Sequence, residues 1–186
     1  ISHQREISEF VQRLKKLLSY NLGKEGRQTT LRMELEIVKE YIALQQMRYD
    51  FIIEMNIEDG SYLDQPTVRM LFQPLVENAI RYGLGDDEKI SIQVFEDVAR
   101  HLAVVTISDS GNGLNQEAID EINQPFDYDW GYWKNENRGI GLRYVKAMLE
   151  SFYDGQTSLF VNSKKGFGTK ITILLPVREP EEKKEK

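Results

Sequence analysis

The stretch ISDSGNGL at residues 107–114 is the most informative part of this sequence. It follows HLAVVTI at 101–107, a run rich in β-branched residues that predicts a strand. The strand ends in a carboxylate, Asp109, and a turn containing Gly111 and Gly113 comes next. Glycines allow positive φ and let a ligand approach the backbone, and a carboxylate accepts hydrogen bonds from an amino group such as that of adenine. An ordinary tight turn has the same pattern, so this motif alone leaves both interpretations open.

The composition is that of one medium-sized domain with a sizeable core. The chain has 186 residues, a formal net charge of −6 and no cysteine. The acidic balance argues against nucleic acid as a partner, and the lack of cysteine excludes disulfides and thiolate metal sites. No apolar run approaches the roughly 18 residues that span a bilayer, and no signal peptide is recognisable. Because the chain starts at Ile1 and not at Met, we expect a fragment of a longer protein.

Helical periodicity predicts two helices in the first third of the chain. Apolar residues between Ile7 and Leu18 lie on one face, which suits either the domain core or pairing with another protomer. The polar break GKEGRQ at 23–28 predicts a boundary between two units. Thr30 is a candidate N-cap for a second helix running to about Arg48. That helix has an apolar stripe formed by Leu31, Leu35, Val38, Ile42 and Tyr49, and FIIEMNI at 51–57 predicts a strand after it.

A third helix is predicted to open at Pro66 and to run through TVRMLFQPLVENAIRYG at 67–83. Pro74 inside it removes a backbone hydrogen bond, so the helix is expected either to kink or to restart there. Asn78 is costly in an apolar helix unless its amide finds partners, which are either a neighbouring loop or a hard cation such as Mg²⁺. Arg81 and Tyr82 lie near the same face and offer a cation for phosphate and a flat ring for a base, unless they are ordinary surface residues.

The second half of the chain predicts two hairpins and two helices. The hairpins pair 89–95 with 101–107 and 156–162 with 170–175, and the helices cover 117–122 and a segment from Leu142 onward. Between the two predicted helices, residues 125–138 show neither the helical nor the strand periodicity and contain both tryptophans. A segment of this length predicts a lid or binding loop. Gly139 and Gly141 then open a helix whose exposed N–H groups suit phosphate. Neither a Rossmann nor a P-loop motif is present.

Four motifs in this order resemble the N, G1, G2 and G3 boxes of the GHKL ATP-binding fold: LVENAIRYG at 75–83, DSGNG at 109–113, RGIGL at 138–142 and GFGT at 166–169. QPLVENA at 73–79 and the helix before it resemble the LytS/YesM-type branch of two-component sensor histidine kinases, although Tyr82 stands where that branch usually has His. The resemblance implies an α+β two-layer sandwich, with a mixed, mostly antiparallel sheet packed on helices and an N-terminal helical segment.

The same resemblance implies three regions. Residues 1–26 would be the tail of a helical dimerisation and phosphotransfer region, 27–178 the GHKL ATP-binding catalytic domain, and 179–186 a disordered charged tail. It also implies ATP and Mg²⁺ as cofactors, with Asn78 as the metal ligand and Asp109 binding the adenine amine. Glu77 matches the motif but lies about 100° round the helix from Asn78, so no firm role follows for it.

The implied site residues are as follows. The catalytic candidates are Asn78, Glu77 and Arg81, and the candidate cationic clamps are Arg81, Lys134 and Arg138. The nucleotide-binding candidates are Asn78, Arg81, Tyr82, Asp109, Gly111, Gly113, Leu114, Arg138, Gly139, Ile140, Gly141, Leu142, Gly168 and Thr169.

The resemblance implies a protein histidine kinase that transfers the ATP γ-phosphate to a histidine and onward to an aspartate of a response regulator. The implied partners are that regulator and the kinase's own His-bearing dimerisation domain, as a homodimer, and the implied place is the cytoplasmic part of a membrane-anchored bacterial sensor. Neither His3 nor His101 lies in the phosphoacceptor motif, so we expect the chain to bind ATP without phosphorylating itself. The alternatives are a non-catalytic, nucleotide-regulated interaction module and a GHKL serine kinase of anti-sigma type. A gyrase-type ATPase is disfavoured because Pro74 stands where its catalytic Glu would be.

Overall fold

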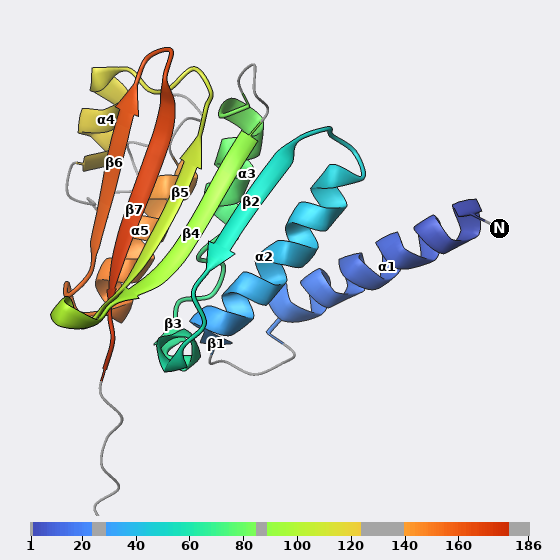
Figure 1. Ribbon diagram of the computed structural model, residues 1–186, viewed down its shortest axis with the longest axis horizontal. Coiled ribbons are helices and arrows are strands. Elements are labelled where there is room, and N and C mark those ends of the chain that lie inside the picture. Colours follow the sequence, from blue (N-terminus) through green and yellow to red (C-terminus); the bar gives the residue numbers. More distant parts are fainter. Residues whose placement is uncertain (1, 24–28, 85–88, 124–139, 179–186) are drawn as a thin grey trace, which may run out of the picture.

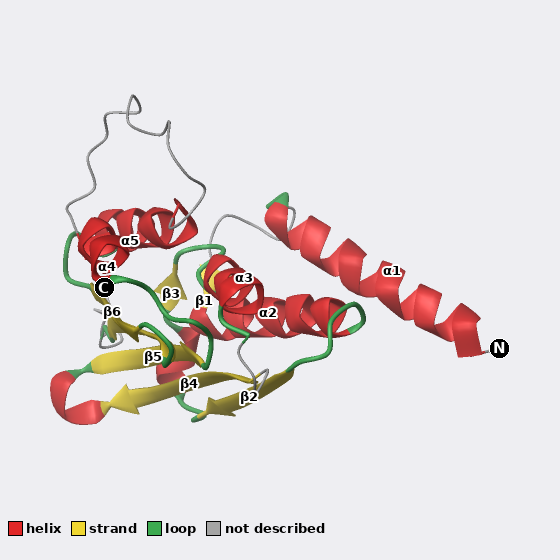
Figure 2. Ribbon diagram, turned by 90° about the horizontal axis from the view of Figure 1, so that it is seen from above, coloured by secondary structure: helices red, strands yellow, loops and turns green. Residues whose placement is uncertain are grey.

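A sheet of five strands, with helices covering one face, forms the centre of the described part of the chain (Figures 1 and 2). The computed structural model describes residues 2–23, 29–84, 89–123 and 140–178. The strand order is β2 (Ile52–Ile57), β4 (Lys89–Asp97), β5 (Leu102–Asp109), β7 (Gly168–Pro176) and β6 (Ser158–Lys164). Only β2 and β4 pair in parallel, and the other neighbours are antiparallel. The predicted mixed, mostly antiparallel sheet and both hairpins are therefore confirmed.

The helices are α1 (Ser2–Asn21), α2 (Leu31–Gln46), α3 (Gln73–Tyr82), α4 (Gln116–Asn123) and α5 (Ile140–Phe152). Short 3-10 turns, η1 and η2, cover Ser61–Asp64 and Val98–Arg100, and β1 (Thr29–Thr30) pairs with β3 (Pro66–Thr67). Figure 2 shows α2, α3 and α5 on the same side of the sheet. The two-layer α+β sandwich with an N-terminal helix is thus confirmed.

The core lies between that helical layer and the sheet. Alternate residues of β4, Ile90, Ile92 and Val94, are almost completely buried, as expected for a strand with one covered face. The apolar stripe of α2 is buried at Leu31, Leu35, Val38 and Ile42, whereas Tyr49 is exposed and lies beyond the end of the helix. Each such buried side chain contributes about 1.5–3 kcal/mol to folding. Thr30 caps α2 as predicted, since its hydroxyl accepts the N–H of Met33 at 3.2 Å.

The prediction that a helix opens at Pro66 is wrong. Pro66 belongs to β3, and α3 begins at Gln73, which places Pro74 in the first turn, where its missing N–H removes no helical bond. Met70 has a φ of 58° and so breaks any helix through this stretch. The periodic apolar residues Val68, Leu71 and Phe72 are buried, but they reach the core from an irregular segment.

Helix α1 packs against α2 in antiparallel orientation through its C-terminal half. Leu17 and Tyr20 are buried with Ile37, and Lys16 pairs with Glu40 at 2.9 Å. Five other apolar residues of α1, namely Ile7, Phe10, Val11, Leu14 and Leu18, are exposed in this single chain. The end of α1 is therefore buried against α2 in a small cluster separate from the main core. Pairing with another protomer remains the prediction for the exposed face. The predicted boundary after residue 26 and the tail at 179–186 lie outside the described residues.

Candidate functional site

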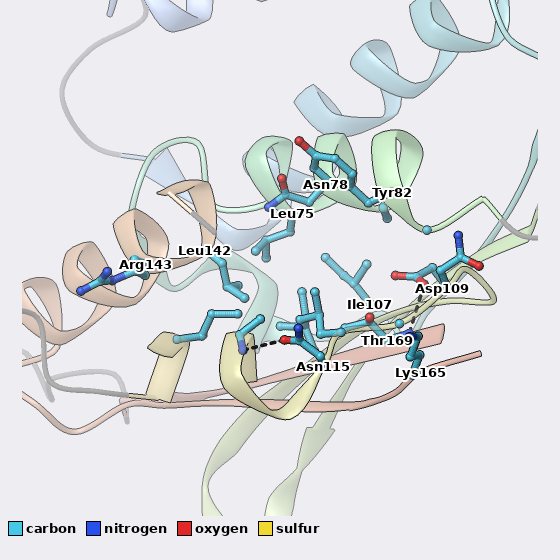
Figure 3. Close-up of a pocket in the computed structure, with 18 of the residues that line it drawn as sticks. Leu75, Asn78, Tyr82, Ile107, Asp109, Asn115, Leu142, Arg143, Lys165 and Thr169 are labelled. Carbon is cyan, nitrogen blue, oxygen red and sulfur yellow. Dashed lines mark hydrogen bonds between the residues drawn. The ribbon is translucent and has the colours of Figure 1, made fainter. Parts of the chain in front are cut away.

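A cavity of about 650 Å³ lies between α3, the turn after β5, the start of α5 and the β6–β7 turn (Figure 3). This volume is in the range of small-molecule and cofactor sites. The described residues that line it are Leu75, Asn78, Ala79, Tyr82, Gly83, Ile107, Asp109, Asn112, Gly113, Leu114, Asn115, Glu117, Ala118, Ile122, Leu142, Arg143, Lys165, Thr169 and Ile171. The structure thus brings Asn78, Tyr82, Asp109, Gly113, Leu114, Leu142 and Thr169 of the predicted site to one cavity.

Asp109 is held in a fixed orientation at the end of β5. It pairs in register with Thr169 at the start of β7, and its Oδ1 accepts the backbone N–H groups of Thr169 and Gly111, both at 3.1 Å. Among the described residues, Oδ2 accepts no hydrogen bond. Burial raises the pKa of the Asp109 carboxyl, and the two backbone hydrogen bonds oppose that shift. The side chain therefore presents one oxygen for an amino group of a ligand.

Two glycines allow the end of α3 to approach Asp109. A Cβ on Gly83 would lie 2.4 Å from the Asp109 Cγ, and a Cβ on Gly111 would lie 2.5 Å from the Gly83 Cα. No other residue fits at these positions without moving the backbone or the carboxylate. Gly111 was predicted from the turn motif, whereas Gly83 was missed, although it ends the LVENAIRYG motif.

Helix α3 contributes Asn78 and Tyr82 to the cavity wall that faces the sheet (Figure 3). A Cβ on Gly141, in the first turn of α5, would lie 3.4 Å from the Asn78 Nδ2, so the start of α5 lies next to the amide. Glu77 and Arg81 form an ion pair at 3.1 Å on the exposed side of α3. Neither is among the described residues that line the cavity, and their predicted catalytic roles stay predictions.

A second hydrogen-bond group ties the turn after β5 to the last hairpin. The Ser163 hydroxyl accepts the N–H of Leu114 at 2.7 Å and donates to the carbonyl of Gly168 at 2.9 Å. It also lies 2.9 Å from the Thr169 hydroxyl, which is then the donor of that bond. Ser163 was missed by the sequence analysis, and no local pattern marks it. Gly168 does not line the cavity but contacts the Asp109 backbone.

Two cations that were not predicted line the cavity. Arg143 and Lys165 line it, and Figure 3 shows Arg143 near Leu142 and Lys165 near Asp109 and Thr169. Their positions beside the RGIGL and GFGT motifs are the sequence signal that was overlooked. The predicted Arg138, Gly139 and Lys134, with the lid at 125–138, lie outside the described residues, and nothing is described of the Ile140 side chain.

The described residues lack two kinds of feature. None of their helices is both long and apolar enough to cross a bilayer. They also contain no group of three or more His, Cys, Asp or Glu side chains suited to a metal ion.

Comparison with known proteins assigns the fold and the family. Residues 63–179 match the model described as histidine kinase-, DNA gyrase B- and HSP90-like ATPase. The chain belongs to this ATPase family. Residues 1–52 of this ATPase-family chain match a second model, described as histidine kinase. The predicted family is therefore confirmed, and the LytS/YesM branch remains a prediction.

Relatives of this ATPase-family chain include proteins named as sensor kinases. It is 30% identical over 168 residues to the sensor protein kinase HptS of Staphylococcus aureus, covering 90% of this chain and 32% of that relative. The chain thus spans about a third of the relative's length.

The solved structures similar to it show the same fold at low sequence identity. One is the catalytic domain of the histidine kinase ThkA, with a TM-score of 0.60 and 16% identity over 81% of this chain and 96% of that one. Another is the Acinetobacter baumannii histidine kinase AdeS, with a TM-score of 0.57 and 18% identity over 95% of this chain and 82% of that one.

Proposed function

We propose that this chain is the ATP-binding catalytic domain of a sensor histidine kinase, which transfers the ATP γ-phosphate to a histidine and onward to a response-regulator aspartate. One observation carries the proposal: an oriented carboxylate, Asp109, and an amide, Asn78, line one cavity of nucleotide size. Sequence similarity to sensor kinases along 90% of this chain supports the kinase class over other members of the ATPase family.

Asp109 would read the base. Its Oδ2 accepts the exocyclic amine of adenine, while the hydrogen bonds to Oδ1 keep the carboxylate from turning away. Ile107 and Ile171 on the sheet and Ala79 on α3 supply apolar walls for the ring. Thr169 lies next to the carboxylate with its hydroxyl bonded to Ser163, which suits a supporting contact at the same end.

Asn78 would hold the metal. Its side-chain oxygen is a hard ligand of the kind Mg²⁺ takes, and the amide lies beside Gly141 in the first turn of α5, where helical N–H groups lack intrahelical partners. When bound, Mg²⁺ neutralises the charge that develops on the phosphates. The first turn of α5 would hold phosphate oxygens, with Arg143 and Lys165 as nearby cations. Arg81 reaches the phosphates only if its side chain leaves Glu77.

The exposed apolar face of α1 is consistent with a homodimer through the helical region that would carry the phosphoacceptor histidine. The apolar side chains of that face, from Ile7 to Leu18, are 38–59% exposed in the described part of this chain. We infer that the parent protein is a membrane-anchored sensor, as its sensor-kinase relatives suggest, and that its partner is a response regulator.

Phosphoryl transfer can be tested with γ-labelled ATP. We expect the chain with Mg²⁺ to label an added His-bearing dimerisation domain with an acid-labile phosphate, and to leave itself unlabelled. Asn78→Ala should lower the labelling at least about 10-fold, because it removes the proposed metal ligand. Binding of Mg·ATP without transfer would favour the interaction module, and acid-stable phosphoserine would favour the serine kinase.

The pH dependence of ATP binding should report Asp109. Burial raises the pKa of this carboxyl, so Asp109 becomes protonated at a higher pH than an exposed aspartate does. Protonation removes the charge that strengthens the hydrogen bond from adenine, so affinity should fall as the pH is lowered through the raised pKa. Calorimetry should measure the ATP affinity of the parent and of Asp109→Asn at each pH. The ratio of the two affinities is compared, because the titration of the ATP phosphates affects both proteins equally and cancels. A ratio that stays constant from neutral to acid pH would contradict this role.

A further inference from the structure

Glu34 is a buried carboxylate that the proposed chemistry does not use. It lies in the first turn of α2 with 2% of its surface exposed, and it is the one charged residue among the buried side chains of the described residues. Its Oε1 accepts the hydroxyl of Tyr20 and the N–H of Met70, and its Oε2 accepts the N–H of Leu71 at 2.7 Å. A buried charge is tolerated only when such donors surround it, so all three contacts matter for its position.

The donors of Glu34 come from two distant parts of the chain. Tyr20 is in the last turn of α1, with 1% of its surface exposed, and its hydroxyl also contacts the Thr29 hydroxyl at 2.6 Å. Arg69 reinforces the same link, because its guanidinium lies 4.6 Å from the centre of the Tyr20 ring and donates to the Tyr20 carbonyl at 2.7 Å. The end of α1 and residues 69–71 are thus held together around one carboxylate.

Residues 69–72 lead directly into α3. Phe72 is the N-cap of that helix and makes no side-chain capping bond, and Met70 has a strained φ of 58°. Leu71 and Phe72 are completely buried, so this segment cannot move without moving the first turn of α3. The same helix carries Asn78, less than two turns further on. The hydrogen bonds that Met70 and Leu71 donate to Glu34 therefore fix the start of the helix that lines the cavity.

We propose that Glu34 is a positioning residue that couples the end of α1 to α3 and thereby sets the placement of Asn78 for the metal-bound nucleotide. The inference rests on the proposed function. If α1 shifts and withdraws the Tyr20 hydroxyl, the Glu34 carboxylate loses a donor and leaves its position. The N–H groups of Met70 and Leu71 then lose their acceptor, and the start of α3 loosens. A movement of the helical region would reach the nucleotide site in this way.

The test compares Tyr20→Phe with Tyr62→Phe. Both remove the hydroxyl of a tyrosine with 1% of its surface exposed, but the Tyr62 hydroxyl bonds the carbonyls of Glu58 and Val94 and not Glu34. In the nucleotide-free chain, we expect amide hydrogen exchange over residues 69–76 to become faster in Tyr20→Phe only. The affinity for Mg·ATP should fall on the order of 10-fold in the same variant, as for other residues that orient a metal ligand.

The loss should fall on the metal-dependent part of binding. We expect the ratio of ATP affinities with and without Mg²⁺ to fall in Tyr20→Phe and in Glu34→Gln and to stay unchanged in Tyr62→Phe, because general destabilisation lowers both affinities together. Unchanged exchange over 69–76, or faster exchange with an unchanged ratio, would overturn the coupling. If the two variants show the expected difference in exchange but the parent chain binds no Mg·ATP, the proposed function is overturned, and the assignment to Asn78 with it.

Discussion

Asp109→Asn is expected to weaken ATP binding about 100-fold, which corresponds to about 3 kcal/mol. The amide keeps an oxygen that can accept the N–H groups of Gly111 and Thr169, so the turn retains its conformation. Its other end becomes an NH₂ group that faces the amine of adenine, so two donors meet and neither finds an acceptor. Calorimetric titration with ATP measures the loss, and thermal unfolding checks that the fold is intact.

The nucleotide preference offers a control for this variant. Guanine has a carbonyl oxygen where adenine has its amine, so the parent should prefer ATP over GTP. Asp109→Asn should lose most of that preference, because its NH₂ group can donate to the guanine oxygen. A variant that still prefers ATP as strongly as the parent would show that another group reads the base.

Gly168→Ala is expected to have the largest effect on stability. Gly168 has a φ of +88°, and a Cβ there would lie 2.0 Å from the carbonyl oxygen of Asp109, which belongs to the backbone and cannot rotate away. The conformation costs about 1–2 kcal/mol for a residue with a Cβ, and overpacking costs about 1–3 kcal/mol more. Because β7 must move away from β5, we also expect loss of ATP binding. Denaturant unfolding and calorimetry measure the two effects.

Gly166→Ala is the matched control for that variant. Gly166 lies two residues earlier, has a φ of +82°, and a Cβ there would meet nothing within 4 Å. Gly166→Ala should therefore lower the folding stability only through its positive φ, by about 1–2 kcal/mol, and leave ATP binding unchanged. Equal destabilisation by both variants would mean that the close approach of β7 to Asp109 is unimportant.

The elements with strong periodicity could be predicted from the sequence. The alternation in 89–95 and the β-branched run before Asp109 gave β4 and β5, and the glycine pattern gave the turn that orients the carboxylate. These predictions succeed because a strand with one buried face and a turn with positive φ each restrict the residue types locally. The resemblance of the ordered motifs then supplied the fold that joins them.

The irregular segment before α3 could not be predicted. Val68, Leu71 and Phe72 have the spacing of a helix, but the backbone N–H groups of Met70 and Leu71 bond to Glu34, which lies 36 and 37 residues earlier. A contact of that range leaves no periodic signal. Ser163 was missed for the same reason, since its role depends on the packing of β6 beside the turn at Leu114.

The pairing of Asp109 with Thr169 has a consequence for changes in chain length. Side chains alternate between the two faces of a strand, so one residue inserted into β7 just after Thr169 would shift the rest of that strand by one position against β5. Ile171 and Ile173 would then turn from the core to the open face. Insertions and deletions among homologous proteins should therefore accumulate in the exposed turn before Gly168, and β7 itself should keep a constant length.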